Sequence, residues 1–188
     1  MNIILLRHGK PQVETALRLT PAELADWVAN YNGAAIDPLH APSKTAMQLA
    51  EASRFVVCSD LRRSRESAHM LGIERIDVCE AAFRELELPY TRWHFPRLPL
   101  LTWAVLFRLL WLLGFSVNGE SLTSSRRRAR QCAEQLAAWA ASHGTVLFVG
   151  HGSLNWFIAR HLRKMGWSGP ARSPRSYWEF AVYHHEAK

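Results

Sequence analysis

Short apolar runs that alternate with helix-like segments constrain the fold of this chain more than any other sequence feature. The clearest run is Thr145–Val149, which glycines bound on both sides. The expected strands are Asn2–Leu6, Phe55–Cys58, Ile76–Cys79, Thr145–Val149 and, at an edge, Tyr177–Tyr183. Helices are expected at about 20–31, 43–52, 61–71, 121–142 and 154–165. This alternation predicts one α/β domain over residues 1–188, with three α/β/α layers and a mostly parallel sheet.

Three of the predicted strands end in polar residues of one chemical character. These residues are Arg7-His8-Gly9, Ser59 with Arg63 shortly after it, and His151-Gly152. In such sheets, ligands bind beyond the carboxyl ends of the parallel strands. If the three strands are neighbours, two histidines and several arginines therefore meet at one edge of the sheet.

A cluster of this kind suits the transfer of a phosphoryl group. Neighbouring arginines lower the pKa of a histidine, because a second positive charge close by is unfavourable. A neutral imidazole is a competent nucleophile, and arginine forks hold phosphoryl oxygens. The amides of Gly152 and Ser153, near the expected start of a helix, are predicted to point to the same place. These residues predict phosphoryl transfer to a histidine, with no metal and no cofactor.

Short motifs in order along the chain resemble those of the histidine phosphatase superfamily, the phosphoglycerate-mutase-like group. They are Arg7-His8-Gly9, Ser59-Asp60-Leu61-Arg62-Arg63-Ser64, Phe83-Arg84-Glu85, Gly119-Glu120-Ser121-Leu122 and Gly150-His151-Gly152. The resemblance implies a histidine phosphatase, which hydrolyses phosphoric monoesters through a phosphohistidine. Its partner would be a small-molecule phosphomonoester or a phosphoprotein.

The resemblance also implies roles for the matching residues. His8 would be the nucleophile that becomes phosphohistidine. The residues expected to bind and stabilise the phosphoryl group are Arg7, Arg63, His151, Gly152 and Ser59. Glu85 would be the general acid that protonates the leaving oxygen, although Glu87 is close enough in the sequence to serve instead.

Other positions depart from the family pattern. Lys10 and Pro11 follow the first motif, where many relatives have Glu and then Ser or Thr. Glu14 stands where asparagine is frequent, and Asp60 and Ser64 replace a usual proline and alanine. These departures, and a chain shorter than typical mutases of the group, favour hydrolysis. The alternatives are mutase-type phosphoryl transfer, or an inactive relative that binds a phosphorylated ligand or a membrane surface.

The segment 98–115, LPLLTWAVLFRLLWLLGF, is apolar except for Arg108. Helices that are apolar all round are buried or lie in a membrane, but Pro99 and Arg108 oppose a span. A lid or buried helix, contact with a membrane surface and a span are the three interpretations. The wider region 89–118 falls where the family varies its substrate cap, so a cap or lid insertion is expected. Its aromatic residues fit an apolar or aromatic leaving group, or they only pack the lid.

The net charge of +7 comes mainly from arginine, because only four of the 23 basic residues are lysines. Arginine excess favours phosphorylated partners. The arginines at 126, 127, 128 and 130 point in different directions around a helix, so a solvated helix face is expected there rather than a nucleic-acid surface. The three cysteines lack metal or redox spacing and are expected to be buried thiols. With an N-terminal run too short for a signal peptide, they predict a cytoplasmic protein.

Overall fold

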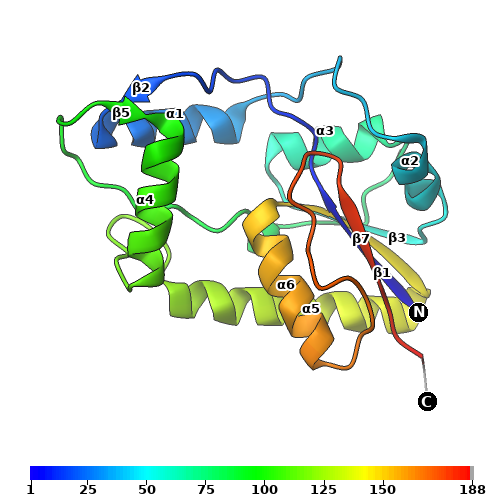
Figure 1. Cartoon of the computed structure of the whole chain (residues 1–188). Helices are drawn as coiled ribbons and strands as arrows, with labels where there is room; N and C mark the ends of the chain where they lie inside the picture. Colours follow the sequence, from blue (N-terminus) through cyan, green and yellow to red (C-terminus); the bar gives the residue numbers. More distant parts are fainter. Residues whose placement is uncertain (187–188) are drawn as a thin grey trace.

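The fold is built on a five-stranded sheet with the strand order β4-β3-β6-β1-β7 (Figure 1). The structure is a computed structural model that describes residues 1–186. The strands are β1 (Asn2–Arg7), β3 (Phe55–Cys58), β4 (Val78–Cys79), β6 (Thr145–Gly150) and β7 (Phe180–His184). All pairs are parallel except β1 with β7, which is antiparallel at the edge of the sheet. The predicted mostly parallel sheet with a final edge strand is therefore confirmed.

Helices cover both faces of this sheet. On one face lie α5 (Leu122–His143) and α6 (Gly152–Lys164), and on the other α2 (Lys44–Glu51) and α3 (Arg62–Met70). Successive residues of β1 supply the two cores in turn, with Ile3 and Leu5 in the first and Ile4 and Leu6 in the second. Alternation along a strand directs neighbouring side chains to opposite faces, so apolar residues at every position predict burial on both. The three-layer arrangement follows directly.

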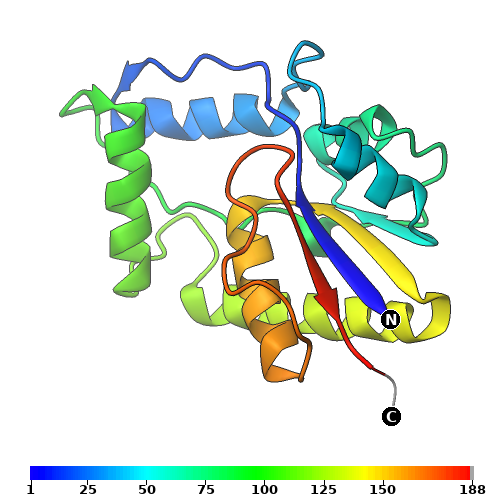
Figure 2. The same cartoon turned by 45° about the vertical axis from the view of Figure 1, so that its right-hand side comes forward.

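A smaller unit extends from one side of the sheet (Figure 2). It consists of α1 (Pro21–Gly33), α4 (Leu100–Leu112) and a two-stranded ribbon of β2 (Arg18–Leu19) and β5 (Leu98–Pro99). Its own small core forms where Leu24 of α1 packs with Leu100, Trp103 and Phe107 of α4.

The helix α4 is half-buried: one side packs against the protein, as expected for a lid or buried helix, and the other side is exposed. Its buried residues, Leu100, Trp103, Phe107 and Trp111, recur every three or four positions and face the protein. Leu101, Val105, Leu106 and Leu109 between them are exposed, whereas Leu110 is partly buried. Within residues 1–186, no helix has the length and apolar character needed to cross a membrane.

Two local expectations were wrong. The strand β4 covers only Val78–Cys79, because the side chain of the preceding Asp77 accepts a hydrogen bond from the Val56 amide of the neighbouring strand at 2.8 Å. Cys79 lies on this short edge strand and is exposed, whereas Cys58 and Cys132 are buried as expected. Because β4 is the outermost strand, no further strand of the described residues lies beside it to cover the Cys79 thiol.

The start of α1 is fixed by a capping box. The Thr20 hydroxyl accepts a hydrogen bond from the Glu23 amide at 3.2 Å, and the Glu23 carboxylate accepts one from the Thr20 amide at 2.8 Å. We expect Thr20→Ala to lower the free energy of unfolding by about 1 kcal/mol, because it leaves the Glu23 amide without its partner. Urea denaturation measures the effect. Thr20→Ser retains the hydroxyl and should be nearly neutral, so an equal loss in both variants would contradict this cause.

Candidate active site

The strand order brings the three polar strand ends together. β6 lies between β3 and β1, with Cys58 paired to Val149 and Arg7 paired to Gly150. The chain continues past these ends, and the His8 amide donates to the Gly150 carbonyl at 3.0 Å. Because all three strands are parallel, the residues that follow them meet at one edge of the sheet.

His8 is buried in a single neutral tautomer. Its Nδ1 donates to the Gly9 carbonyl oxygen at 2.7 Å, so the proton sits on Nδ1. Nε2 therefore carries the lone pair, and it accepts a hydrogen bond from Arg63 Nε at 3.3 Å. Gly9 has no substitute at this position, since a Cβ there would lie 2.3 Å from the Trp178 ring. The geometry leaves one nitrogen of His8 as a nucleophile facing an arginine.

Arg63 is itself held by the end of α1. Its Nη1 donates to the Tyr31 carbonyl at 3.2 Å and to Asn32 Oδ1 at 3.1 Å. Its guanidinium also lies over the Tyr31 ring, 4.6 Å from the ring centroid. Arg62 and Arg65, as expected, are on the exposed side of α3. The sequence alone indicated no partner for Arg63, because α1 comes from a distant part of the chain.

His151 stands next to His8, with ring centroids 5.1 Å apart. Its Nε2 forms a hydrogen bond of 2.7 Å with the hydroxyl of Ser59, which is also fully buried. The buried Nδ1 of His151 has no hydrogen-bond partner among residues 1–186, and neither does the buried Nε of Arg7. The Nε–H of Arg7 is a donor, and so is Nδ1 of His151 when the Ser59 hydroxyl donates to Nε2, so in that tautomer both can bind an anion.

The segment before β7 lies over the same site. The Arg7 guanidinium donates to the Arg175 carbonyl and packs over the Tyr177 ring, 4.4 Å from its centroid. Trp178 adopts a φ of 64°, a conformation that is strained for an aromatic residue. Hydrogen bonds from Trp178 Nε1 to the His40 carbonyl at 2.6 Å and from its amide to the Arg7 carbonyl at 3.1 Å hold it there. No motif in the sequence signalled this contribution.

Glu85 is positioned by the start of α6. Its carboxylate accepts hydrogen bonds from the amides of Ser153 at 3.1 Å, Leu154 at 3.0 Å and Leu86 at 2.9 Å. The helix start was expected at Leu154 with the Gly152 and Ser153 amides turned to a phosphate. The helix instead begins at Gly152, and the Ser153 amide binds Glu85. Glu87, the other candidate acid, is exposed.

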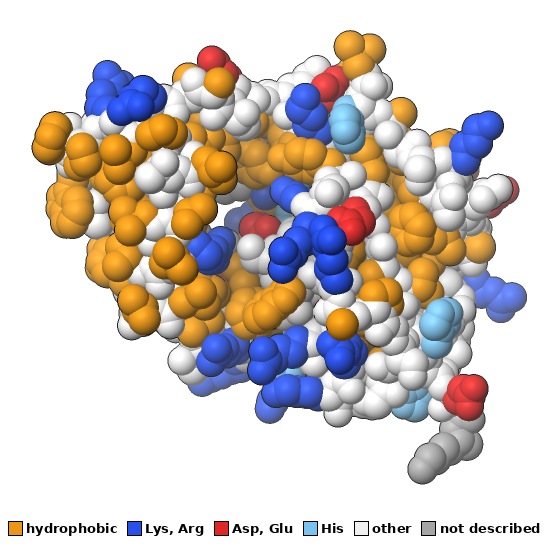
Figure 3. Space-filling view, viewed as in Figure 1, with side chains coloured by type: hydrophobic (Ala, Val, Ile, Leu, Met, Phe, Trp, Pro, Cys, Tyr) orange, Lys and Arg blue, Asp and Glu red, His pale blue; other side chains and the backbone are white. Residues whose placement is uncertain are grey.

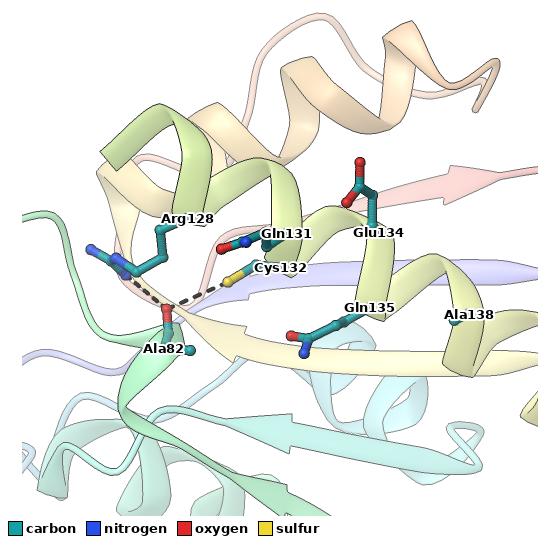
Figure 4. Close-up of a pocket in the computed structure, with 7 residues that line it drawn as sticks. All are labelled: Ala82, Arg128, Gln131, Cys132, Glu134, Gln135 and Ala138. Atoms are coloured by element: carbon teal, nitrogen blue, oxygen red, sulfur yellow. Dashed lines mark hydrogen bonds between the residues drawn. The ribbon is translucent and has the colours of Figure 1, made fainter. Parts of the chain in front are cut away.

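Arg128 braces the chain just before Glu85 (Figure 4). Its Nη1 donates to the carbonyls of Ala82 at 2.7 Å and Arg84 at 2.9 Å, and Cys132 Sγ also contacts the Ala82 carbonyl at 3.4 Å. A half-buried ion pair with Glu120, at 2.7 Å, fixes the same guanidinium. The expectation of a solvated face was therefore wrong for Arg128, because its neighbours in space are carbonyls of a distant turn. It holds for Arg126, Arg127 and Arg130, which are exposed.

A cavity of about 500 Å³ opens beside these residues. Its lining includes Arg7, Glu85 and Gly152, together with Arg108, Trp111, Leu112, Trp156, Phe157 and residues of the segment before β7. Arg108 donates from Nη2 to the Leu86 carbonyl at 3.4 Å, while its buried Nη1 has no partner among the described residues. The only charge of the apolar segment thus points toward the candidate site.

Burial and the arginines keep both histidines uncharged. Burial is the largest cause that lowers the pKa of His8 from 6.5 to about 3, and the charge of Arg63 is the next. The pKa of His151 lies well below its usual value for the same reasons, with His8 adding to the effect. The sequence predicted the arginine contribution, but the larger contribution of burial depends on the fold. Both imidazoles are therefore neutral at physiological pH.

The site is rich in basic groups and poor in metal ligands. Across residues 1–186, no group of three or more His, Cys, Asp or Glu side chains is arranged to hold a metal ion. The positive charge near His8 comes from the guanidinium groups of Arg7 and Arg63. Such groups bind the oxygens of a phosphoryl or carboxylate group.

Comparison with known protein families finds one family that covers most of the chain. The family model of the histidine phosphatase superfamily (branch 1) matches residues 39–187. The match begins after Arg7-His8-Gly9, so the position of His8 beside the matched motifs comes from the structure. No curated protein has a significantly similar sequence.

Several solved structures share the fold. An open reading frame product of Mycobacterium tuberculosis has a TM-score of 0.63 and 18% identity, covering 98% of this chain and 91% of that chain. Mycobacterial glucosyl-3-phosphoglycerate phosphatase has a TM-score of 0.57 and 23% identity, covering 87% and 79%. A protein described as mycobacterial hydrolase 1 has a TM-score of 0.57 and 21% identity, covering 99% and 97%.

The lowered pKa of His8 makes the stability of the fold depend on pH. Between about pH 6.5 and pH 3 the unfolded chain takes up a proton at His8 that the folded chain does not. The free energy of unfolding therefore decreases as the pH is lowered through that range. We expect this residue to remove about 2 kcal/mol of stability between pH 7 and pH 5.

Urea unfolding of the wild type and of His8→Gln at the two pH values isolates the effect of His8. The variant should lose about 2 kcal/mol less than the wild type on acidification. His69→Gln, at an exposed histidine of α3, should behave like the wild type. Equal losses in the wild type and His8→Gln would show that His8 is not held neutral.

Proposed function

The chain belongs to the histidine phosphatase superfamily (branch 1), and from that premise we propose that it hydrolyses phosphomonoesters through a phosphohistidine on His8. The observation that carries this proposal is the buried, neutral His8, whose Nε2 keeps its lone pair and accepts a hydrogen bond from Arg63. A nucleophile needs that lone pair, and burial together with the arginines keeps it unprotonated at neutral pH.

The first step forms a bond between His8 Nε2 and phosphorus while the bond from phosphorus to the leaving oxygen breaks. The lone pair of His8 Nε2 cannot accept a hydrogen bond from Arg63 and attack phosphorus at the same time. Arg63 would therefore turn its Nε from His8 to a phosphoryl oxygen. The free Nε of Arg7 and Nδ1 of His151 supply two further polar contacts. This set matches the charge of a phosphoryl group, which is spread over three oxygens.

Glu85 would handle the proton in both steps. It lies in the same cavity as Arg7 and is held by amides at the start of α6. It gives a proton to the leaving oxygen, which departs as an alcohol. It then takes a proton from a water molecule that attacks phosphorus, and the electron pair of the P–N bond returns to His8 Nε2. The products are the alcohol and inorganic phosphate.

The cavity walls suggest the class of leaving group. Trp111, Trp156 and Phe157 give apolar lining to the cavity that Arg7 and Glu85 also line. We therefore propose that residues 89–118 act as a cap over the site and that the substrate is a phosphomonoester with an apolar or aromatic leaving group. The mycobacterial glucosyl-3-phosphoglycerate phosphatase has been solved with inorganic phosphate, which fits a phosphate-binding role for the shared fold.

His8→Ala tests the nucleophile. We expect hydrolysis of a generic aryl phosphate, measured with excess chelator, to fall to the uncatalysed rate in this variant. The reason is that the first step has no acceptor for the phosphoryl group once Nε2 is gone. His69→Ala removes an exposed histidine outside the site and should retain wild-type turnover. Turnover by His8→Ala, or loss of turnover with chelator in the wild type, would contradict the proposal.

Glu85→Gln tests the general acid against Glu87→Gln as a matched control. With an alkyl phosphate, whose leaving group needs a proton, Glu85→Gln should reduce kcat by about 10²–10⁴-fold. With a nitrophenyl phosphate the first-turnover release of nitrophenolate should keep nearly the wild-type rate, because nitrophenolate departs without protonation, while steady-state kcat still falls because Glu85 also activates the attacking water. Glu87 is exposed, and its variant should keep wild-type kcat on both substrates. A larger loss in Glu87→Gln would reassign the acid.

A further inference from the structure

The outer face of α4 is mainly apolar, and its exposed polar residue is Thr102. We define the α4 outer face by the exposed Leu101, Val105, Leu109 and Leu112 of α4 and by Leu113, which directly follows the helix. Leu113 is 85% exposed and Leu101 is 73% exposed. Figure 3 shows this face as a broad hydrophobic area on the side of the molecule where α4 lies. Soluble monomers rarely expose contiguous apolar areas of this kind without a partner.

No charge interrupts this face. Residues 98–118 contain no acidic side chain, and their only basic one is Arg108. Arg108 points the other way, toward the Leu86 carbonyl and over the Trp111 ring, 4.9 Å from its centroid. Arg108 therefore lies beside Val105 and Leu109 at the margin of this face, with its guanidinium turned toward the protein.

Basic residues stand at both ends of the α4 outer face. Before α4, the exposed Arg18 donates to the carbonyl of Arg97, which itself pairs with Glu23 at 2.6 Å. After α4, Arg126 and Arg127 are exposed in the first turns of α5. Figure 3 shows arginine and lysine side chains above and below the hydrophobic area. An apolar strip between basic ends complements a surface with an apolar interior and anionic headgroups.

We propose that the α4 outer face docks on the surface of an anionic lipid bilayer. A second copy of the chain fits less well. If two copies packed these faces about a two-fold axis, a basic end would meet a basic end whether the helices ran parallel or antiparallel. A bilayer with anionic headgroups instead attracts the arginines while the leucines enter the headgroup boundary, and the net charge of +7 adds to that attraction.

Docking in this orientation has a consequence for the candidate site, which rests on the proposed function. Leu112 belongs to the α4 outer face and also lines the cavity. Trp156 of α6, which is 40% exposed, lines the same cavity. The mouth of the cavity therefore lies at the margin of the docked surface. A phosphomonoester whose apolar part is anchored in the bilayer would enter the cavity lined by Arg7 and Glu85 from there without leaving the lipid completely.

Vesicle binding tests the docking separately from turnover. The full chain is sedimented with phosphatidylcholine vesicles that contain or lack phosphatidylglycerol. The wild type should bind the anionic vesicles, and high salt should weaken the binding by screening the arginines. Leu101→Glu/Leu113→Glu should reduce the affinity about tenfold or more, because it puts two charges into the headgroup boundary. Leu39→Glu alters a leucine that is 93% exposed outside α4 and should leave binding unchanged.

The outcomes are distinct. Lack of binding by the wild type, equal binding by Leu101→Glu/Leu113→Glu, or an equal loss in Leu39→Glu would overturn the docking. A dimer in size-exclusion chromatography with light scattering that the double variant dissociates, without any vesicle binding, would assign the face to a second copy. Hydrolysis of a soluble aryl phosphate, expected to be unchanged in the double variant, reports on the proposed function alone. Its failure with intact vesicle binding would remove the catalysis and keep the docking.

Discussion

The hydrogen bond from His8 Nδ1 to the Gly9 carbonyl is the interaction on which the rest of the site depends. It places the only proton of the neutral ring on Nδ1 and leaves Nε2 free for phosphorus. Burial and the adjacent Arg63 prevent a second proton from binding at neutral pH. A histidine in this state combines nucleophilicity with a positively charged surrounding that attracts a phosphoryl group.

The sheet supplies this state through its order and direction. Because β3, β6 and β1 are adjacent and parallel, residues separated by more than 140 positions in the sequence, such as His8 and His151, come to lie with rings 5.1 Å apart. The packing around them then allows little variation. Gly9 leaves room for the ring of Trp178, and Trp178 tolerates a strained backbone because two hydrogen bonds hold it. Strain of this kind is characteristic of functional sites.

Sequence patterns predicted the helices and strands, because hydrophobic periodicity is a local property of the sequence. They also predicted that the polar strand ends converge, because ligand sites in parallel sheets generally lie at the carboxyl ends of the strands. They did not predict contacts that need the tertiary structure. Arg128 has the pattern of a surface arginine, yet it braces the turn before Glu85 through two carbonyls. Arg7 contacts the segment before β7, which carries no recognisable motif. For α4, the uniform composition concealed which face is covered, and only packing against α1 and α6 decided it.

The covalent intermediate is the central claim, and locating the phosphoryl group tests it most directly. Enzyme mixed with an aryl phosphate is quenched in alkali within one turnover, digested and analysed by mass spectrometry, with ³¹P NMR on the quenched protein to identify the nitrogen. The geometry predicts a phosphoryl group on Nε2 of His8, because Nδ1 is engaged by the Gly9 carbonyl. A phosphoryl group on His151 or on Nδ1 of His8, or turnover with no phosphorylated peptide, would contradict the proposed mechanism.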